Sequence, residues 1–265
     1  MISSEYGQFH NPPLLPGIKP VLELLSSNPQ RINCIYCKKS LNTSEIKHIQ
    51  NICKQKSIKF SLVNDTILSK LCHGTINSKR IINHQGIIAR LNSTSFCSLE
   101  SLFSQTQSSP LPVILALDQV QDPGNIGTLC RTLYALGGSG IIIPKHNSAY
   151  IGPAAYKSSA GALEKLSIAC VTNLAHALDS AEEAGFIIYG TDCNQTNSAN
   201  IFTQTINFPS VLVLGNEQKG LRPVIRKRCS SMLHIPMSRS FDSLNVAQAG
   251  AILLAFIAKN AFTSV

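Results

Sequence analysis

The sequence contains no tryptophan, and aromatic residues make up only 6% of its 265 residues. This scarcity argues against ligand recognition by large aromatic platforms. No apolar run approaches the roughly 18 residues that a membrane-spanning helix needs, and the first residues lack the basic and then apolar pattern of a secretory signal. We therefore expect a cytoplasmic protein without membrane contact. At 44% apolar residues the chain can build a core, which excludes a mostly disordered protein.

Several common motifs are also missing. There is no Walker loop, which argues against an NTPase. The glycine-rich stretch at 137–140 comes after an expected helix and before a strand, which is the wrong order for a dinucleotide turn. Cys34 and Cys37 fall in an expected strand, and no second Cys or His pair completes a zinc site. We therefore predict no metal, and we interpret the nine cysteines as reduced thiols of an intracellular protein.

The charge is distributed unevenly along the chain. Residues 1–92 contain 12 Lys and Arg against 4 Asp and Glu, a balance of +8. Residues 93–110 carry −1, and residues 111–265 carry 11 cations against 9 anions, so that the chain has a net charge of +9. A basic module beside a near-neutral larger one is typical of a nucleic-acid enzyme, in which one part binds phosphate and the other carries the chemistry. A solvated lysine-rich surface is the alternative.

The spacing of apolar residues predicts a small α/β domain over residues 1–92. We expect its helices at 17–27, 42–54 and 65–72, and its strands at 31–37, 59–63 and 86–91. Asn42 or Thr43 is placed to cap the second helix, whose apolar face holds Ile46, Ile49 and Cys53.

A linker and a larger domain follow. Residues 93–110 are rich in Ser, Thr and Gln and end at a proline, which predicts a linker. Within residues 111–265 we expect strands at 113–117, 140–143, 186–190, 211–214 and 232–235, and helices at 125–136, 173–184 and 243–258. Strands that alternate with helices predict an α/β domain with a mostly parallel sheet covered on both faces.

The first informative segment, Asp118–Arg131, has the sequence DQVQDPGNIGTLCR and follows an expected buried strand. Its Pro-Gly pair predicts a sharp turn, after which Asn125 is placed to cap a helix. Gly127 would let another element approach the first turn closely, and Arg131 follows in the second turn. Taken alone, the pattern also describes an ordinary turn and helix with a surface arginine.

The second segment, Val211–Arg228, has the sequence VLVLGNEQKGLRPVIRKR. An all-apolar strand ends there in the polar stretch Gly215–Glu217, and ligands of parallel sheets bind where the strands end. A carboxylate and an amide at this edge suit a ligand with amine or hydroxyl groups, and the same residues suit an ordinary strand-to-helix loop. The basic run at 226–228 is a candidate phosphate contact.

The third segment, Leu233–Ala249, has the sequence LHIPMSRSFDSLNVAQA. A polar loop follows a short strand, and Ser243 is placed to cap the last helix, with Leu244, Asn245 and Val246 in its first turn. Free backbone N–H groups there can bind an anion or a carboxylate, and the alternative is an ordinary capped helix.

In this order the three segments are specific, and the chain resembles the SpoU/TrmH family of S-adenosylmethionine-dependent RNA 2′-O-ribose methyltransferases. DPGNIGTLCRT is similar to the family's motif 1, VLGNEQKGL to motif 2, and IPM followed by SLNVAQA to motif 3. The resemblance covers residues 111–260, and the basic first module resembles, less closely, the family's L30e-like substrate-binding domain. The layout is most similar to the bacterial branch that methylates a guanosine in the peptidyl-transferase P loop of 23S rRNA.

The resemblance implies a SPOUT domain over residues 111–265, with a deep trefoil knot near its end and S-adenosyl-L-methionine as the cofactor. It also implies no metal and a homodimer through this domain, to which we expect helix 243–258 and the start of the motif 1 helix to contribute. The cofactor would lie bent in the knot and be held largely by backbone groups. The residues expected around it are Leu214, Gly215, Ile235, Met237, Leu244 and Val246.

The implied reaction is an in-line attack of a ribose 2′-oxygen on the methyl group of a sulfonium. In the family, the residue that matches Arg131 is proposed as the base. A guanidinium stays charged in proteins, so Arg131 would instead favour the ionised hydroxyl or hold a phosphate while another group or water takes the proton. Asn125 would position the ribose or orient Arg131, and Glu217 would orient Arg131 or bind the substrate. Ser243 and Asn245 match motif 3 residues that shape the site.

Three alternatives remain from the sequence. The first is a tRNA ribose methyltransferase of the same family, against which the L30e-like module weighs. The second is a non-catalytic RNA-binding or ribosome-assembly protein that kept the fold, against which intact Asn125, Arg131, Glu217 and Asn245 weigh. The third is an antibiotic-resistance methyltransferase with a different target nucleotide.

Overall fold

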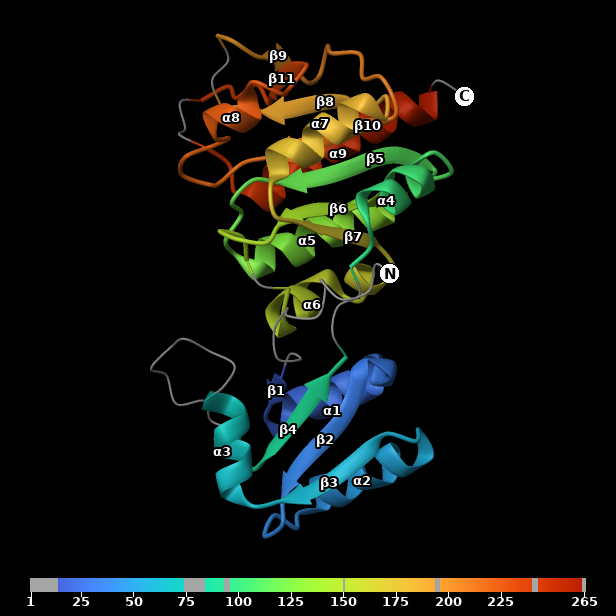
Figure 1. Cartoon of the computed structure of the whole chain (residues 1–265), viewed down its shortest axis with the longest axis vertical. Coiled ribbons are helices and arrows are strands. Elements are labelled where there is room, and N and C mark those ends of the chain that lie inside the picture. The colour runs from blue at the N-terminus through green and yellow to red at the C-terminus, as the bar shows by residue number, and fades with distance from the viewer. Residues whose placement is uncertain are drawn as a thin grey trace, which may run out of the picture. The chain divides into compact units, whose positions relative to one another are not determined.

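The computed structural model describes residues 14–73, 84–92, 96–149, 151–193, 196–239 and 243–263 (Figure 1). The chain divides into two units, Met1–Thr94 and Ser95–Val265, and each is described by itself. Within the described ranges, every helix is too short or too polar to cross a membrane.

A four-stranded sheet in the order β1-β4-β2-β3 forms the centre of the first unit. β2 and β3 are parallel, and β4 runs antiparallel to both of its neighbours. The elements are β1 Leu14–Pro16, α1 Ile18–Ser27, the 3-10 turn η1 Pro29–Arg31, β2 Ile32–Lys38, α2 Ser44–Gln55, β3 Lys59–Val63, α3 Asp65–His73 and β4 Ile87–Leu91. Cys34 and Cys37 lie in β2 and are buried.

Helix α2 illustrates why these residues form their elements. Thr43 is its N-cap, and the hydroxyl oxygen of Thr43 accepts a hydrogen bond from the backbone N–H of Ile46 at 3.4 Å. Ile46, Ile49 and Cys53 are buried, as the helical spacing predicts. The predicted elements of this unit are confirmed, with ends that differ by no more than two residues.

The second unit contains a seven-stranded sheet in the order β7-β6-β5-β10-β8-β11-β9, whose described neighbours all run parallel. The strands are β5 Leu111–Leu117, β6 Gly138–Pro144, β7 Ser167–Val171, β8 Ile187–Thr191, β9 Ala199–Asn200, β10 Ser210–Leu214 and β11 Ser231–His234. The helices are α4 Leu99–Thr106, α5 Pro123–Ala135, α6 Pro153–Ser159, the 3-10 turn η2 Ala162–Glu164, α7 Leu174–Glu183, α8 Pro223–Arg226 and α9 Val246–Thr263. The predicted α/β class with a mostly parallel sheet is confirmed.

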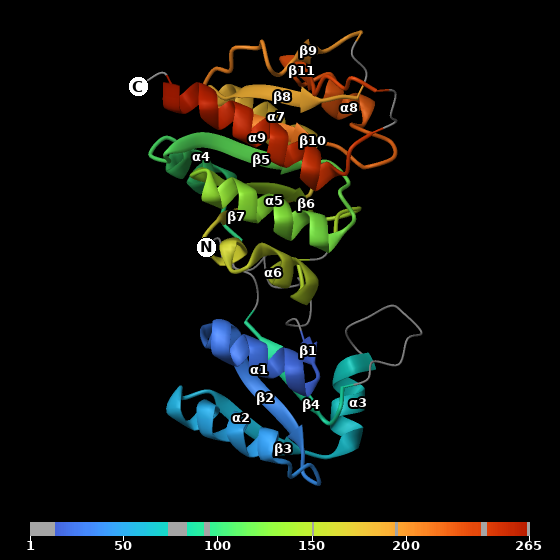
Figure 2. The ribbon, with the colours of Figure 1, turned by 180° about the vertical axis from the view of Figure 1, so that it is seen from behind.

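Helices cover both faces of this sheet. Helices α5 and α9 pack on one face (Figure 2), and α4 and α7 pack on the other (Figure 1). Strand β5 supplies both cores: Val113, Leu115 and Leu117 join α5 and α9, whereas Ile114 and Ala116 join α4 and α7. All five side chains are buried, which explains why the strand is a continuous apolar run.

The linker predicted at 93–110 needs correction, because Leu99–Thr106 form helix α4. Ser98 caps this helix by accepting a hydrogen bond from a backbone N–H of the first turn at 3.3 Å. Leu102 and Phe103 are buried in the core beneath the helix. The polar composition concealed a two-turn helix whose apolar residues share one face.

Candidate active site

Three segments far apart in the sequence meet where parallel strands of the second unit end. Strand β5 ends at Leu117, β10 at Leu214 and β11 at His234, and a loop follows each strand. β5 and β10 are direct neighbours, with Leu117 opposite Leu214. The carboxyl ends of parallel strands are the usual place for a ligand in such sheets.

Helix α5 begins two residues earlier than expected, and this changes the role of Asn125. Asp122 is the N-cap, since its side chain accepts a hydrogen bond from the backbone N–H of Gly124 at 2.8 Å, and Pro123 occupies the first helical position. The prediction that Asn125 caps the helix is therefore wrong. Asn125 is 9% exposed in the first turn, and its side chain reaches the neighbouring loops instead.

The close approach predicted at Gly127 is confirmed. A Cβ atom on this residue would lie 2.0 Å from Ser158 Oγ and 2.1 Å from the carbonyl oxygen of Ala155, both in α6. Only glycine lets α5 and α6 pack at this separation, because a backbone atom cannot move aside as a flexible side chain does. Gly127 thereby holds α6 against the helix that carries motif 1.

Asn245, not Ser243, caps helix α9. Its Oδ1 atom accepts hydrogen bonds from two backbone N–H groups of the first turn, at 2.9 and 3.4 Å. The helix itself begins at Val246. Ser243 and Leu244 lie before the helix, so the prediction that Ser243 is the cap and that Leu244 lies in the first turn is wrong.

A chain of side-chain hydrogen bonds joins the three segments. Asn245 Nδ2 donates to Oδ1 of Asn125 at 3.2 Å, and Asn125 Nδ2 donates to Oε1 of Glu217 at 2.9 Å. Each amide thus both donates and accepts, which fixes the orientation of the two asparagines. A carboxylate oxygen can accept several hydrogen bonds, so Glu217 keeps capacity for a donor on a ligand.

Arg131 lies outside this network. It is exposed on α5 and makes no hydrogen bond or ion pair with the residues that the structure describes. Ser243 is partly buried, and it likewise makes no such contact within the described ranges. The structure therefore brings together Asn125, Glu217 and Asn245 from the predicted catalytic set, and it joins neither Arg131 nor Ser243 to them.

The cysteines of motif 1 and of the segment after α8 have the properties of core thiols. Burial raises the pKa of the Cys130 thiol to about 12 and that of the Cys229 thiol to about 12. Both groups are protonated at neutral pH, and a protonated thiol is a far weaker nucleophile than a thiolate. A covalent step on either sulfur is therefore disfavoured.

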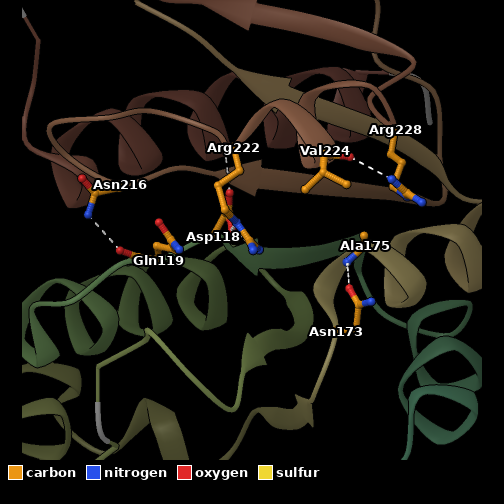
Figure 3. A network of polar contacts seen from close by, with 8 residues as sticks. All are labelled: Asp118, Gln119, Asn173, Ala175, Asn216, Arg222, Val224 and Arg228. Carbon is orange, nitrogen blue, oxygen red and sulfur yellow. Dashed lines mark hydrogen bonds and ion pairs between the residues drawn. The ribbon is translucent and has the colours of Figure 1, made fainter.

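Sequence reasoning missed the residues that hold the motif 2 loop, here defined as Gly215–Leu221. Asp118 follows β5 and is fully buried, and Arg222 reaches it through its backbone N–H at 3.0 Å, Nε at 2.8 Å and Nη2 at 2.7 Å (Figure 3). Asn216 Nδ2 donates to the carbonyl oxygen of Gln119 at 3.0 Å. An aspartate directly after an all-apolar strand is the available signal, because a buried carboxylate requires a partner.

The motif 2 loop also closes on itself. The backbone groups of Asn216 and Gly220 exchange hydrogen bonds of 3.1 and 2.9 Å. A Cβ atom at Gly215 would lie 2.4 Å from the carbonyl carbon of Gly220, so the closure requires glycine at this position.

The basic run at 226–228 is held largely by carboxylates, which corrects its interpretation as a phosphate contact. Arg226 pairs with Asp192 at 2.5 Å, and Arg228 pairs with Asp179 through Nε at 2.6 Å and Nη2 at 3.1 Å. The hydrogen bonds from Arg228 hold the pKa of Asp179 below its usual value. Two of the three cations are therefore engaged inside the fold.

The predicted cofactor residues lie along the same edge of the sheet. Leu214 and Val246 are buried in one apolar cluster, against which Ile235 packs. Met237 and Leu244 are partly buried in the segments that flank them. These residues lie at or after the ends of β10 and β11 or at the start of α9, where a parallel sheet usually binds its ligand.

Comparison with known proteins identifies the family. Residues 112–255, more than half of the chain, match the SpoU rRNA Methylase family. The chain belongs to this family. Residues 14–96 match a second description, RNA 2′-O ribose methyltransferase substrate binding. This SpoU-family RNA methyltransferase thus has a substrate-binding region before its methylase region, in the order that the charge distribution suggested.

Relatives match almost the whole SpoU-family chain. It is 31% identical over 239 residues to the 23S rRNA (guanosine-2′-O-)-methyltransferase RlmB of Pasteurella multocida, covering 90% of this chain and 94% of that protein. The RlmB of Pseudomonas putida is 29% identical over 241 residues, with coverage of 90% and 92%.

Solved structures share the fold. The SpoU methyltransferase AviRb from Streptomyces viridochromogenes superposes with a TM-score of 0.67 at 20% identity, covering 96% of this chain and 91% of that chain. AviRb in complex with the cofactor AdoMet gives a TM-score of 0.65 at 21% identity, with coverage of 94% and 90%.

Proposed function

We propose that the protein is an S-adenosyl-L-methionine-dependent RNA 2′-O-ribose methyltransferase that modifies a guanosine in the peptidyl-transferase P loop of 23S rRNA. The observation that carries the proposal is the hydrogen-bonded chain Asn245–Asn125–Glu217, which joins the three motif segments at one edge of the sheet. The choice of 23S rRNA is supported by the RlmB relatives, whose likeness extends over 90% of the chain.

The cofactor is assigned to the ends of β10 and β11, where the three motif segments meet. Leu214 and Val246 would contact the adenine, while backbone groups of Gly215 and of the stretch from Ile235 to Met237 would bind its polar edges and the methionine part. This arrangement needs no glycine-rich dinucleotide turn. When bound, S-adenosyl-L-methionine supplies a methyl group on a sulfonium, which is already a good electrophile.

The protein's own task is to align the ribose hydroxyl and help it lose a proton. Glu217, fixed by Asn125, is placed to accept a hydrogen bond from a ribose or base donor. The charged guanidinium of Arg131 would stabilise the oxygen as it ionises or hold an adjacent phosphate. The proton then passes to a carboxylate or to water.

The proposal includes a homodimer through the second unit. Ile252, a large apolar side chain, is exposed on α9, a helix that the resemblance places at the interface. Burying this side chain against a second copy would be favourable. The deep trefoil knot stays a prediction of the resemblance.

Methyl transfer to defined RNAs tests the proposal. The full chain is incubated with labelled S-adenosyl-L-methionine and unmodified large-subunit rRNA, small-subunit rRNA or tRNA, and the modified nucleotide is mapped. A single 2′-O-methylguanosine in the P loop is the expected result. Label confined to tRNA would overturn the assigned substrate, and cofactor binding without label in any RNA or ribosomal particle would favour an assembly protein.

A further inference from the structure

The motif 2 loop, Gly215–Leu221, is anchored to the sheet on its C-terminal side by an ion pair. The backbone N–H of Arg222 donates to Oδ2 of Asp118 at 3.0 Å, and Nε donates to Oδ1 at 2.8 Å, while Nη2 lies 2.7 Å from the same Oδ1. The backbone N–H of Asp118 in turn donates to the carbonyl oxygen of Leu214 at 2.8 Å. Both ends of the loop are therefore fixed relative to the two central strands β5 and β10.

The N-terminal side of the loop has its own anchor. Asn216 Nδ2 donates to the carbonyl oxygen of Gln119, whose φ of +61° turns the backbone after β5 (Figure 3). Asn216 Oδ1 accepts hydrogen bonds from the backbone N–H groups of Gln218 at 3.0 Å and Lys219 at 3.2 Å. A single asparagine thus shapes the turn and ties it to the segment that follows β5.

Glu217 lies between these two anchors. Its neighbour Asn216 is one anchor, and Arg222 is the other. Asp118 is fully buried, and a buried carboxylate that loses its cation is left uncompensated, so the Arg222 contact strongly favours one position of the loop. Nε and Nη2 of Arg222 both approach Oδ1 of Asp118, and the planar guanidinium restricts their direction, which the single ammonium of lysine does not do.

We propose that Arg222 and Asp118 are positioning residues, which hold the motif 2 loop in the conformation that lets Glu217 accept the hydrogen bond from Asn125. This inference rests on the proposed function, because Glu217 is there the group that faces the substrate. Neither Arg222 nor Asp118 touches the reacting atoms in this assignment. Their contribution is alignment, and misplacement of an aligned group by about 1 Å can cost roughly 100-fold in rate.

The test compares two arginine-to-lysine substitutions. Arg222→Lys keeps the charge and removes the planar guanidinium, and Arg228→Lys does the same at Asp179, a residue of α7 outside the network. Hydrogen exchange on the free protein reads the loop directly, since the backbone N–H groups of residues 216, 218, 219 and 220 are hydrogen-bonded within it. We expect the loop amides to exchange about tenfold faster in Arg222→Lys than in the unchanged protein, and we expect no change of the exchange rate in Arg228→Lys.

Methyl transfer supplies the second readout. Arg222→Lys should lower kcat roughly 10- to 100-fold with an unchanged unfolding midpoint, whereas Arg228→Lys should retain full transfer. In a double-mutant cycle, adding Arg222→Lys to Glu217→Gln should cost no further activity, because the group being positioned is already gone. If the contact contributed only to general stability, the activity losses of the two substitutions would multiply in the double mutant.

The outcomes separate this inference from the function on which it rests. Unchanged exchange of the loop in Arg222→Lys, or multiplying losses in the double mutant, would overturn the positioning role even if the protein methylates RNA. Faster exchange of the loop in a protein that transfers no methyl group would leave the anchor intact and remove the proposed function. Should Arg222→Lys fail to fold, Asp118→Asn weakens the same contact from the other side and is measured in the same way.

Discussion

The two regions of the chain differ in how many carboxylates are available to their cations. Residues 1–92 contain 12 Lys and Arg but only 4 Asp and Glu. In the second unit, by contrast, the arginines at positions 222, 226 and 228 each form an ion pair with an aspartate. Lys54, Lys56 and Lys59 of the first unit are exposed, as is Arg131 of the second. A cation tied to a carboxylate stabilises the fold and presents little charge to RNA, while an unpaired one stays available. Whether a cation has a carboxylate partner therefore indicates better than net charge which cations can contribute to RNA affinity or to the reaction.

Removing Arg131, an exposed arginine without a carboxylate partner among the described residues, should have the largest effect. Arg131→Ala is expected to lower methyl transfer by at least about 1,000-fold, because a charge near the reacting oxygen is lost. The affinity for S-adenosyl-L-methionine should stay within about twofold, since that ligand is held by other residues. Radiolabel transfer and calorimetry measure the two quantities. Lost cofactor affinity in a normally folded variant would contradict the role assigned to Arg131.

Neutralising cations of the first unit should instead weaken RNA binding. Replacing Lys54, Lys56 and Lys59 by Gln is expected to reduce the slope of log affinity against log salt by about 2, if each lysine neutralises one phosphate. Binding titrations at several salt concentrations measure this slope. Lys227→Gln, an exposed lysine of the second unit, is the control and should leave the slope unchanged. An unchanged slope in the triple variant would show that these three lysines do not contribute to RNA binding.

Two helix caps in the second unit separate folding from function. Asn245 caps α9 and also donates to Asn125, whereas Asn173 caps α7 by accepting a hydrogen bond from the N–H of Ala175 at 3.0 Å (Figure 3). Substituting alanine for either asparagine should lower the free energy of unfolding by about 1 kcal/mol. Only Asn245→Ala should also lower methyl transfer. Denaturant unfolding and the transfer assay decide the matter, and equal activity of the two variants would remove Asn245 from the site.

The smallest effect concerns a paired cation. Arg228 lowers the pKa of Asp179 in the folded protein, so the ionised carboxylate stabilises the fold above the unfolded-state value of about 3.9 and this stability is lost as the pH falls through the lower folded value. The carboxylate side chain is 38% exposed, which limits the contribution to less than about 1 kcal/mol. Asp179→Asn should therefore destabilise the protein slightly at pH 7, and the difference should vanish as the pH falls through the lowered folded-state pKa of Asp179. Urea unfolding at a series of acidic pH values measures the difference, and a difference that does not shrink as the pH falls would point to another cause.

Local patterns predicted the helices and strands well where apolar residues recur at a regular spacing, as in α2. They failed by a few residues at caps, because two residues of capping type stood close together. Asp122 precedes a proline, which favours it over Asn125, and Asn245 lies directly before the apolar run of α9, which favours it over Ser243.

Other elements depend on distant contacts. Helix α6 is short and rich in small residues, and it packs where Gly127 leaves room, 28 residues or more earlier in the chain. Strand β7, which the sequence patterns did not predict, has only five residues and lies at one edge of the sheet. The Asp118–Arg222 pair joins positions 104 apart, and no periodicity in the sequence reports such a pairing. Motif resemblance supplied Asn125, Glu217 and Asn245, but their connection required the structure.

Helix α4 determines where an independently expressed methylase fragment has to begin. A fragment starting at residue 111 would lose Leu102 and Phe103 and leave the side chains of Ile114 and Ile142 facing water, which invites aggregation. Cys97 contributes as well, because its backbone N–H donates to the carbonyl oxygen of Ile168 at 2.9 Å and so protects an edge strand. The 18 serine-rich positions 93–110, which look dispensable in the sequence, thus include the helix that covers one core of the second unit.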